Sequence, residues 1–354
     1  MSDPTLVHLH SVIGCFVITL LACPSDRLAV VHEAVDDSTP SRVAAVNAAD
    51  SGASSQRSPP MSSNTLLADS GSGGGNMAAA IGGSGAAPDP AVQVAAPCID
   101  KQLPPVADYG EMGPFVMRIE TNLGPGGAYT MFRPDELGVD GFMHPVATWG
   151  NGVSTTPDQY TALLSTVASH GFVVIASDSK SVSAQELKTG LDWLLAQNDM
   201  PGEFQGKLAV KCAVAIGYSM GGGAAVGAAS HPNVIATVAL HGLQAPAAEL
   251  RGPLLLMTST NDGFVTKSGY VQPTYDASSK VPTIMATLNV PGAADFSGHL
   301  IPLGDAGKER APLIAWLRLF VLGDRAAKSW FYGADCTLCK EPWTDIQRKN
   351  GDWN

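Results

Sequence analysis

Charged residues are scarce in this chain of 354 residues: Asp, Glu, Lys and Arg together make up only 15% of it. Acidic residues outnumber basic ones, the formal net charge is −11, and Lys and Arg form no cluster. Proteins that bind DNA or RNA gather such cations against the phosphate backbone. The composition therefore argues against a nucleic-acid partner and favours a globular protein with a large buried interior.

The N-terminal region lacks a hydrophobic run long enough to span a bilayer. Its apolar stretch, within residues 11–25, is shorter than the roughly 20 residues that a membrane-spanning helix needs, and it suits a signal peptide. The letters LLAC end at Cys23 and resemble a bacterial lipobox. We expect residues 1–23 to be a signal peptide. The mature protein is then either secreted or anchored through a lipid on Cys23 at the cell surface or in the periplasm.

Aromatic residues are absent from residues 24–97, where Ala, Ser, Gly, Pro and Asp dominate. A segment with so few large apolar side chains cannot offset the entropy lost when its backbone becomes ordered. We predict a disordered linker over 24–97, followed by one folded domain over 98–354.

Short apolar runs alternate with amphipathic segments beyond residue 109. The predicted strands are 115–120, 128–134, 144–152 with its Gly-rich end, 172–177, 213–219, 234–240, 253–260 and 282–290. The predicted helices are 157–170, 184–198, 220–232 and 311–323. Apolar strands that alternate with helices are typical of a doubly wound, mostly parallel α/β sheet. Ligands bind such sheets at the carboxyl ends of the strands, so polar residues that directly follow a strand are candidates for function.

The motif G-x-S-x-G occurs at Gly217-Tyr218-Ser219-Met220-Gly221, between an apolar strand and a helix. In a nucleophile elbow this motif holds the serine on a strained turn, where small neighbours avoid collisions. The turn exposes the serine Oγ and directs helical N–H groups toward it, so Met220 can donate to an oxyanion. The same glycines would also suit a junction that only packs tightly, so Ser219 has to be judged together with its partners.

A nucleophilic serine needs a base and a carboxylate that orients the base. In this topology they follow in the order serine, acid, histidine. Asp262 follows a predicted strand, and His299 lies in the loop after the next one, so these residues are the candidate acid and base. Asp295, which is close to His299 in sequence, and Asp178, which follows an earlier strand, are weaker alternatives for the acid.

The loop after the strand at 144–150 offers the second oxyanion donor. Glycines on both sides of Asn151 let the backbone approach closely, so the N–H of Asn151 is the candidate and that of Gly152 the alternative. His241 ends the strand 234–240 at the same edge of the sheet. It is a candidate substrate contact and a weaker candidate for the base.

Five segments together resemble the bacterial cutinase and polyester (PET) hydrolase branch of the α/β-hydrolase fold. They are GPFVMRIETNLGPGGAYTMFRP, LLSTVASHGFVVIASDS, GYSMGGG, PLLLMTSTNDGFV and GAADFSGHLIP, and the resemblance extends over about residues 113–324. It implies Ser219 as nucleophile, Asp262 as acid and His299 as base. It also implies an oxyanion hole made by the N–H groups of Met220 and Asn151, and a reaction that needs no cofactor or metal ion.

Two departures from that family concern the substrate. Asn151 stands where the family has an aromatic residue, and ALHGLQAP (239–246) lacks a Trp, so His241 or Leu243 would line the site instead. Each missing ring removes stacking of ~0.5–1.5 kcal/mol. We therefore expect the site to bind aromatic polyesters more weakly than other esters.

The six cysteines show no zinc-finger spacing. In an exported chain, the lone C-x-x-C of Cys336 and Cys339 favours a disulfide over a metal site or a redox motif. Cys336 could pair with Cys339, or one of them with Cys98. Cys212, at the edge of the strand before Ser219, is expected to be a buried free thiol.

The sequence thus predicts a monomeric serine carboxylester hydrolase that acts on short- and medium-chain esters and on polyesters. A dienelactone-type or carbohydrate esterase on the same fold is one alternative, because a fold does not determine a substrate. A surface module that binds without catalysis is another. The order of Ser219, Asp262 and His299 counts against it, because binding alone does not require all three.

Overall fold

The computed structural model describes residues 98–99, 103–291 and 295–354. The predicted signal peptide, its Cys23 and the predicted linker lie outside the described residues, so those expectations stay predictions.

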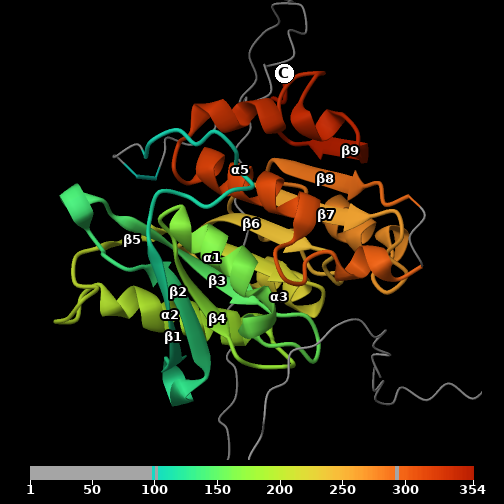
Figure 1. Cartoon of the computed structure of the whole chain (residues 1–354). Helices are drawn as coiled ribbons and strands as arrows, with labels where there is room; N and C mark the ends of the chain where they lie inside the picture. Colours follow the sequence, from blue (N-terminus) through green and yellow to red (C-terminus); the bar gives the residue numbers. More distant parts are fainter. Residues whose placement is uncertain (1–97, 100–102, 292–294) are drawn as a thin grey trace, which may run out of the picture. The chain divides into compact units, whose positions relative to one another are not determined.

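Within the described residues, a nine-stranded sheet forms the centre of the fold (Figure 1). Its order is β1-β2-β4-β3-β5-β6-β7-β8-β9. The strands from β4 to β8 in this order pair in parallel, whereas β1 and β2 at one edge and β9 at the other pair antiparallel. The strands are β1 (Met117–Leu123), β2 (Tyr129–Pro134), β3 (His144–Gly150), β4 (Val173–Ser177), β5 (Leu208–Tyr218), β6 (Val234–Leu240), β7 (Leu254–Ser259), β8 (Thr283–Leu288) and β9 (Trp343–Lys349).

Helices cover both faces of this sheet, which explains why its parallel strands are apolar throughout. The helices are α1 (Thr161–Ser169), α2 (Ala184–Gln197), α3 (Met220–Ala228), α4 (Gln272–Ala277) and α5 (Arg310–Phe320). On one face, Leu163 of α1 and Trp316 of α5 belong to the same buried cluster as Trp149. On the other, Leu187 of α2 and Val226 of α3 are buried with Ile175. The predicted α/β-hydrolase arrangement, a mostly parallel sheet flanked by helices, is confirmed.

None of the described helices is both long and apolar enough to cross a membrane.

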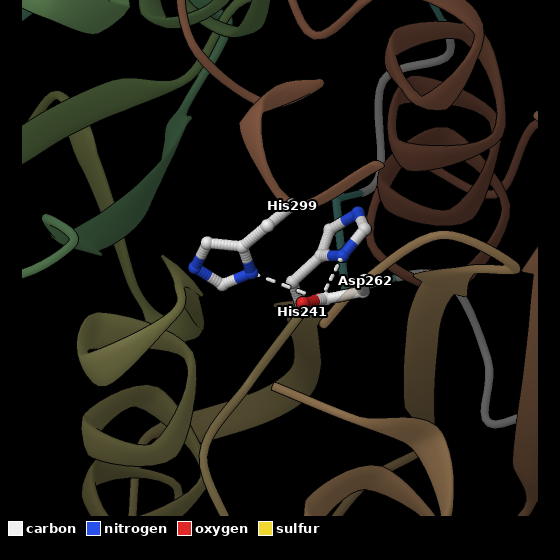
Figure 2. Close-up of side chains that lie close together, drawn as sticks. All are labelled: His241, Asp262 and His299. Carbon is white, nitrogen blue, oxygen red and sulfur yellow. Dashed lines mark hydrogen bonds and ion pairs between the residues drawn. The ribbon is translucent and has the colours of Figure 1, made fainter. Parts of the chain in front are cut away.

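The loops after β6, β7 and β8 bring three polar side chains together at one edge of the sheet (Figure 2). His241 directly follows β6, Asp262 follows β7, and His299 lies on the short 3-10 helix η5 (Ser297–Leu300) after β8. Parallel strands end at the same edge, so residues far apart in sequence meet there.

The C-terminal segment adds the strand β9, which the sequence analysis did not predict. It pairs with β8, with Leu288 opposite Trp343 and Thr283 opposite Lys349. Its sequence, WTDIQRK, is polar, and Trp343 is its one buried residue. Edge strands are often polar because exposed apolar edges promote aggregation, and this polarity hides them from a search for hydrophobic runs. The short helix α4 was also not predicted.

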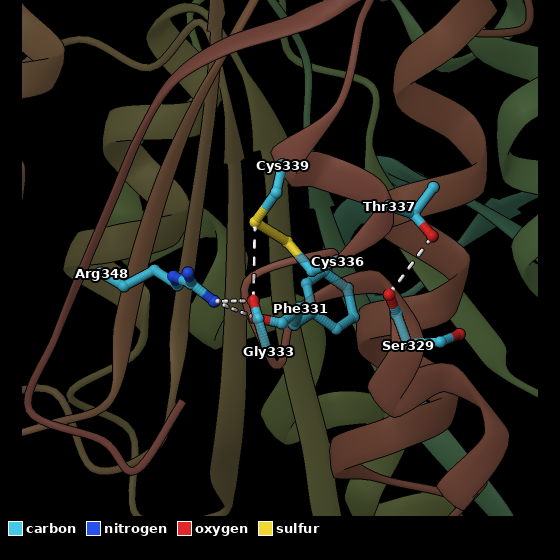
Figure 3. Close-up of a disulfide and its surroundings, with 7 residues drawn as sticks. All are labelled: Ser329, Phe331, Gly333, Cys336, Thr337, Cys339 and Arg348. Atoms are coloured by element: carbon cyan, nitrogen blue, oxygen red, sulfur yellow. Dashed lines mark hydrogen bonds between the residues drawn. A yellow bond between two sulfur atoms is a disulfide. The ribbon is translucent and has the colours of Figure 1, made fainter. Parts of the chain in front are cut away.

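A disulfide between Cys336 and Cys339 closes the turn before β9 (Figure 3). Nearby, Arg348 of β9 donates to the backbone carbonyls of Phe331, at 2.9 Å, and Gly333, at 3.1 Å. These bonds hold β9 against the segment that precedes the turn. Of the pairings predicted for the tail cysteines, the structure contains the one between Cys336 and Cys339.

The second disulfide joins Cys98 to Cys212, 114 residues away. The prediction that Cys212 is a free thiol is therefore wrong, and Cys98 does not pair with a tail cysteine. Cys212 lies in the first half of β5, beside the start of the described domain, and the two Cα atoms are 5.8 Å apart. The tertiary structure decides which distant segments lie next to each other. The spacing of the cysteines along the chain therefore could not reveal this disulfide.

Replacing Cys98 and Cys212 together by serine is expected to lower the free energy of unfolding by about 4 kcal/mol, because this bond closes a long loop in the unfolded chain. The matched variant Cys336→Ser/Cys339→Ser opens a loop of only a few residues and should cost about 1–2 kcal/mol. Urea unfolding followed by tryptophan fluorescence measures both changes. Equal losses, or a larger loss from the tail pair, would contradict this explanation.

Candidate active site

Ser219 occupies a strained turn of one residue between β5 and α3. Its φ is 56° and its ψ is −120°. Residues other than glycine rarely adopt a positive φ, and such strain persists where the surrounding structure enforces it. This backbone conformation is what the nucleophile-elbow motif predicts for its serine.

Close packing around the turn requires the two glycines of the motif. A Cβ on Gly217 would lie 2.1 Å from the carbonyl oxygen of Gly221, and a Cβ on Gly221 would lie 2.0 Å from that of Gly150. Gly150 ends β3, directly before the loop that carries Asn151. Without side chains at these positions, the Ser219 turn and the Asn151 loop can lie against each other.

Ser219, His299 and Asp262 form a continuous chain of hydrogen bonds. The Nε2 of His299 lies 3.0 Å from the Oγ of Ser219, and its Nδ1 lies 2.9 Å from the Oδ2 of Asp262. Ser219 is 6% and His299 7% exposed. This geometry allows the imidazole to take a proton from Ser219 while a carboxylate stabilises the resulting charge.

Asp262 is held as a carboxylate by four N–H donors. The backbone N–H groups of Phe264 and Val265 donate to its Oδ1 at 3.1 and 2.7 Å, and the Nδ1 atoms of His241 and His299 face its Oδ2. Burial raises the pKa of Asp262, but the hydrogen bonds from the two histidines outweigh burial and hold this pKa well below its usual range. The group is therefore ionised at neutral pH.

The alternative acids lie elsewhere. Asp178 accepts a hydrogen bond of 2.7 Å from the Oγ1 of Thr130. Asp295 is exposed, and its backbone carbonyl accepts from the N–H of Gly263. In the part of the chain that the structure describes, the carboxylate bonded to His299 is that of Asp262.

Tyr218, the residue before the serine, supports the loop that carries His299. Its Oη donates to the backbone carbonyl of His299 at 2.8 Å, and the two rings pack with centroids 5.1 Å apart. Burial raises the pKa of Tyr218, so its hydroxyl stays protonated and remains a donor. The variable position of the motif thus has a role that the motif itself does not reveal.

The structure favours Asn151 over Gly152 as the second oxyanion donor. The N–H of Gly152 donates to the Oη of Tyr160 at 3.2 Å and is already engaged. Met220, the other candidate, begins α3, where the first N–H groups of a helix have no partner within the helix.

The side chain of Asn151 holds its own loop in place. Its Oδ1 accepts from the Nε1 of Trp149 at 2.9 Å, and its Nδ2 donates to the carbonyl of Ser177 at 2.5 Å. The residue is fully buried. Asn151 stands where the family it resembles has an aromatic residue. Its side chain holds the backbone of the loop in place and is not available to contact a substrate.

His241 lies in the interior and does not line the substrate site. Its Nδ1 is 2.7 Å from the Oδ2 of Asp262, its Nε2 is 2.8 Å from the Oε1 of Glu309, and its side chain is 0% exposed. Both nitrogens face carboxylates, so no nitrogen is left for a substrate or for Ser219. The predictions of His241 as a substrate contact or as the base are therefore wrong.

The charge of His241 is set by its two carboxylate neighbours. Burial alone would lower the pKa of His241, but the charge of Glu309 and the hydrogen bonds to Asp262 and Glu309 raise it to about 9. The imidazole is therefore positively charged at neutral pH. Glu309 is not recognisable as a site residue from the sequence, because it lies on the short 3-10 helix η6 (Gly307–Glu309) within an ordinary charged stretch, GDAGKER.

The histidines and the aspartate of this cluster also have the residue types of a metal site. His241, Asp262 and His299 each place one possible ligand atom within 4.8 Å of the others. However, the Nδ1 atoms of both rings point at the same oxygen, at hydrogen-bonding distance (Figure 2). Because these atoms already bond to one another, the arrangement fits a hydrogen-bond relay better than a metal centre.

An exposed aromatic pair borders the site beside His299. The rings of Phe264 and Phe296 lie 4.4 Å apart, Phe264 is 5.5 Å from the ring of His299, and both phenylalanines are 49% exposed. The sequence predicts few aromatic faces here and does not reveal this pair, although Phe264 follows Asp262 by only two residues. Leu243 is partly exposed, and its N–H donates to the carbonyl of Ser219 at 3.0 Å.

The family model and the curated proteins that match this chain agree on one kind of protein. A family model described as PET hydrolase-like matches residues 116–347. Cutinase 2 of Thermobifida cellulosilytica is 30% identical over 170 residues, which are 45% of this chain and 61% of that protein. Cutinase cut1 of Thermobifida fusca is 30% identical over 170 residues, 45% of this chain and 50% of that protein.

Cutinase est2 of Thermobifida alba is 27% identical over 213 residues, 53% of this chain and 68% of that protein. The chain thus spans between half and about two thirds of the length of these curated relatives. The family model covers more than half of the chain, and its range includes the Ser219 elbow, Asp262 and His299. The protein therefore belongs to the PET hydrolase-like family.

Proposed function

We propose that the protein is a serine carboxylester hydrolase in which Ser219 is the nucleophile, His299 the base and Asp262 the orienting acid. The hydrogen-bonded chain from the Oγ of Ser219 through both nitrogens of His299 to Asp262 carries this proposal. Membership of the PET hydrolase-like family and the similarity to cutinases support the same reaction class.

The first half of the reaction forms an acyl-enzyme. The Nε2 of His299 takes the proton of Ser219, and the Oγ attacks the carbonyl carbon of the ester. Asp262 stabilises the imidazolium, while the N–H groups of Met220 and Asn151 donate to the oxygen that becomes negative. The intermediate collapses when the alcohol leaves with the proton from His299, and the acyl group stays on Ser219.

The second half releases the acid. His299 takes a proton from water, and the resulting hydroxide attacks the acyl carbon on Ser219. The same N–H groups stabilise the second oxyanion. Collapse returns the proton from His299 to Ser219 and frees the carboxylic acid. His299 thus carries every proton transfer in the cycle, and the backbone N–H groups stabilise both oxyanions.

The substrates are short- and medium-chain esters and polyesters. The exposed rings of Phe264 and Phe296 offer an apolar surface beside His299 on which an acyl chain or a polymer segment can lie. Leu243, next to the Ser219 turn, is a further contact. The two disulfides support export, since such bonds persist in oxidising compartments. A monomeric state remains a prediction.

Full-length protein is expected to hydrolyse p-nitrophenyl esters, with turnover highest for short to medium acyl chains. Ser219→Ala and His299→Ala should each lower kcat by about 10⁴-fold or more, because the groups act as a unit. Ser230→Ala and His231→Ala are matched controls just beyond the far end of α3 and should keep the wild-type rate. Circular dichroism checks that all four variants are folded.

Wild-type turnover by Ser219→Ala or His299→Ala would contradict the assigned roles. No turnover by the wild type at any chain length would contradict the proposed activity and favour a binding role for this site.

Phe264→Ala and Phe296→Ala should each raise KM for long-chain and aromatic esters about 2- to 10-fold, because each ring contributes ~0.5–1.5 kcal/mol of contact. The kcat for an acetyl ester should stay within about twofold, since the backbone N–H of Phe264 still donates to Asp262. Met200→Ala, which truncates another exposed apolar residue after α2, is the control. Equal effects on acetyl and long-chain esters would argue against a substrate contact.

A further inference from the structure

A second imidazole–carboxylate pair adjoins Asp262 and takes no part in the steps described above. His241 connects Asp262, at 2.7 Å, to Glu309, at 2.8 Å, and the side chains of all three are 0% exposed. Together with the bonds of His299, these contacts form one chain from the Oγ of Ser219 to the Oε1 of Glu309.

The positions of the protons follow from the donors and acceptors in this chain. Both oxygens of Asp262 already accept hydrogen bonds, Oδ1 from two backbone N–H groups and Oδ2 from the two histidines. An ionised carboxylate can only accept, so His241 must donate from its Nδ1. A second proton must lie between its Nε2 and Glu309. An imidazolium with a proton on each nitrogen satisfies both contacts, in agreement with the raised pKa of His241.

We propose that His241 and Glu309 position Asp262 and set the charge beside the catalytic base, so that the reaction depends on a relay of five side chains. This inference rests on the proposed ester hydrolysis. His241 and Glu309 act through Asp262 and His299 and touch no substrate, so both are positioning residues.

The charges of the relay balance when the base is protonated. Glu309, His241 and Asp262 together carry a single net negative charge, which the imidazolium of His299 cancels after it takes the proton of Ser219. Without the cation on His241, two buried carboxylates would share this space with no compensating charge, which is costly in a protein interior.

The charge of His241 also acts on His299 directly. The two rings lie 5.6 Å apart, and like charges at this distance oppose each other. The imidazolium of His241 therefore places a positive charge directly beside the ring of the base. Among the described residues, Tyr218 also faces His241, with the two ring centroids 6.4 Å apart, and its raised pKa keeps it neutral.

Glu309→Gln tests the charge while preserving the size of the side chain. Without the anion, burial lowers the pKa of His241, and its Nε2 loses the proton. This nitrogen then accepts a hydrogen bond from the new amide, while Nδ1 still donates to Asp262. The positive charge beside His299 disappears. We expect the midpoint of the acid limb of kcat/KM to rise by about 0.5–1 pH unit.

The double variant His241→Gln/Glu309→Gln tests the positioning. His241→Gln alone leaves Glu309 buried without a cation and threatens folding, whereas removal of both charged groups is tolerated better. We expect the double variant to fold and to lose about 10-fold in kcat with little change in KM, because Asp262 loses its rigid donor. His231→Gln removes a histidine that pairs with Asp192 at the surface, and it should change neither kcat nor the pH profile.

Nitrogen-15 NMR of the histidine rings in the full-length protein gives a readout that needs no turnover. The signals of His241 are those that disappear in the double variant. In the wild type they should show both ring nitrogens protonated at neutral pH, and in Glu309→Gln they should show a neutral ring. His231→Gln should leave them unchanged.

Two results would overturn the inference while the proposed function stands. One is a wild type that hydrolyses esters and whose kcat and pH profile superimpose on those of Glu309→Gln and the double variant. The other is a neutral ring of His241 at neutral pH in the wild type. Absence of ester turnover in the wild type is the failure of the proposed function itself, and the wild-type assay shows it before any variant is compared.

Discussion

The site depends on one buried carboxylate, that of Asp262. Two backbone N–H groups, from Phe264 and Val265, hold it in the turn after β7, and two imidazoles from the neighbouring loops converge on its other oxygen. A buried anion is stable only when such donors surround it. Asp262 therefore fixes the relative positions of the loops after β6, β7 and β8, and with them the orientation of His299 toward Ser219.

The parallel sheet and the small residues at its edge make this arrangement possible. Parallel pairing brings the ends of β5, β6, β7 and β8 to one edge, where side chains separated by up to 80 residues form hydrogen bonds. Gly217 and Gly221 then allow the strained Ser219 turn to lie against the loop after β3. Strain at Ser219 is maintained by this close packing and by the bonds of its backbone to β6 and Leu243.

Much of the fold was predictable because its central elements have strong local patterns. The apolar parallel strands and the helices between them stand out by composition, and the structure has them close to the predicted ranges. β9 was missed because a polar edge strand carries little hydrophobic signal. The free thiol predicted at Cys212 was wrong because its partner, Cys98, is distant in sequence and near only in space.

For the site, the sequence by itself determined the candidate nucleophile, acid and base: the order of Ser219, Asp262 and His299 along the strands limits them to few choices. Only the tertiary structure decided how the surrounding groups are used. It places His241 in the interior beside Glu309, engages the N–H of Gly152 with Tyr160, and brings Phe264 to Phe296 at the surface. The physical reason is that a motif records spacing along the chain, whereas burial and hydrogen-bond partners depend on which distant segments the packed sheet brings together.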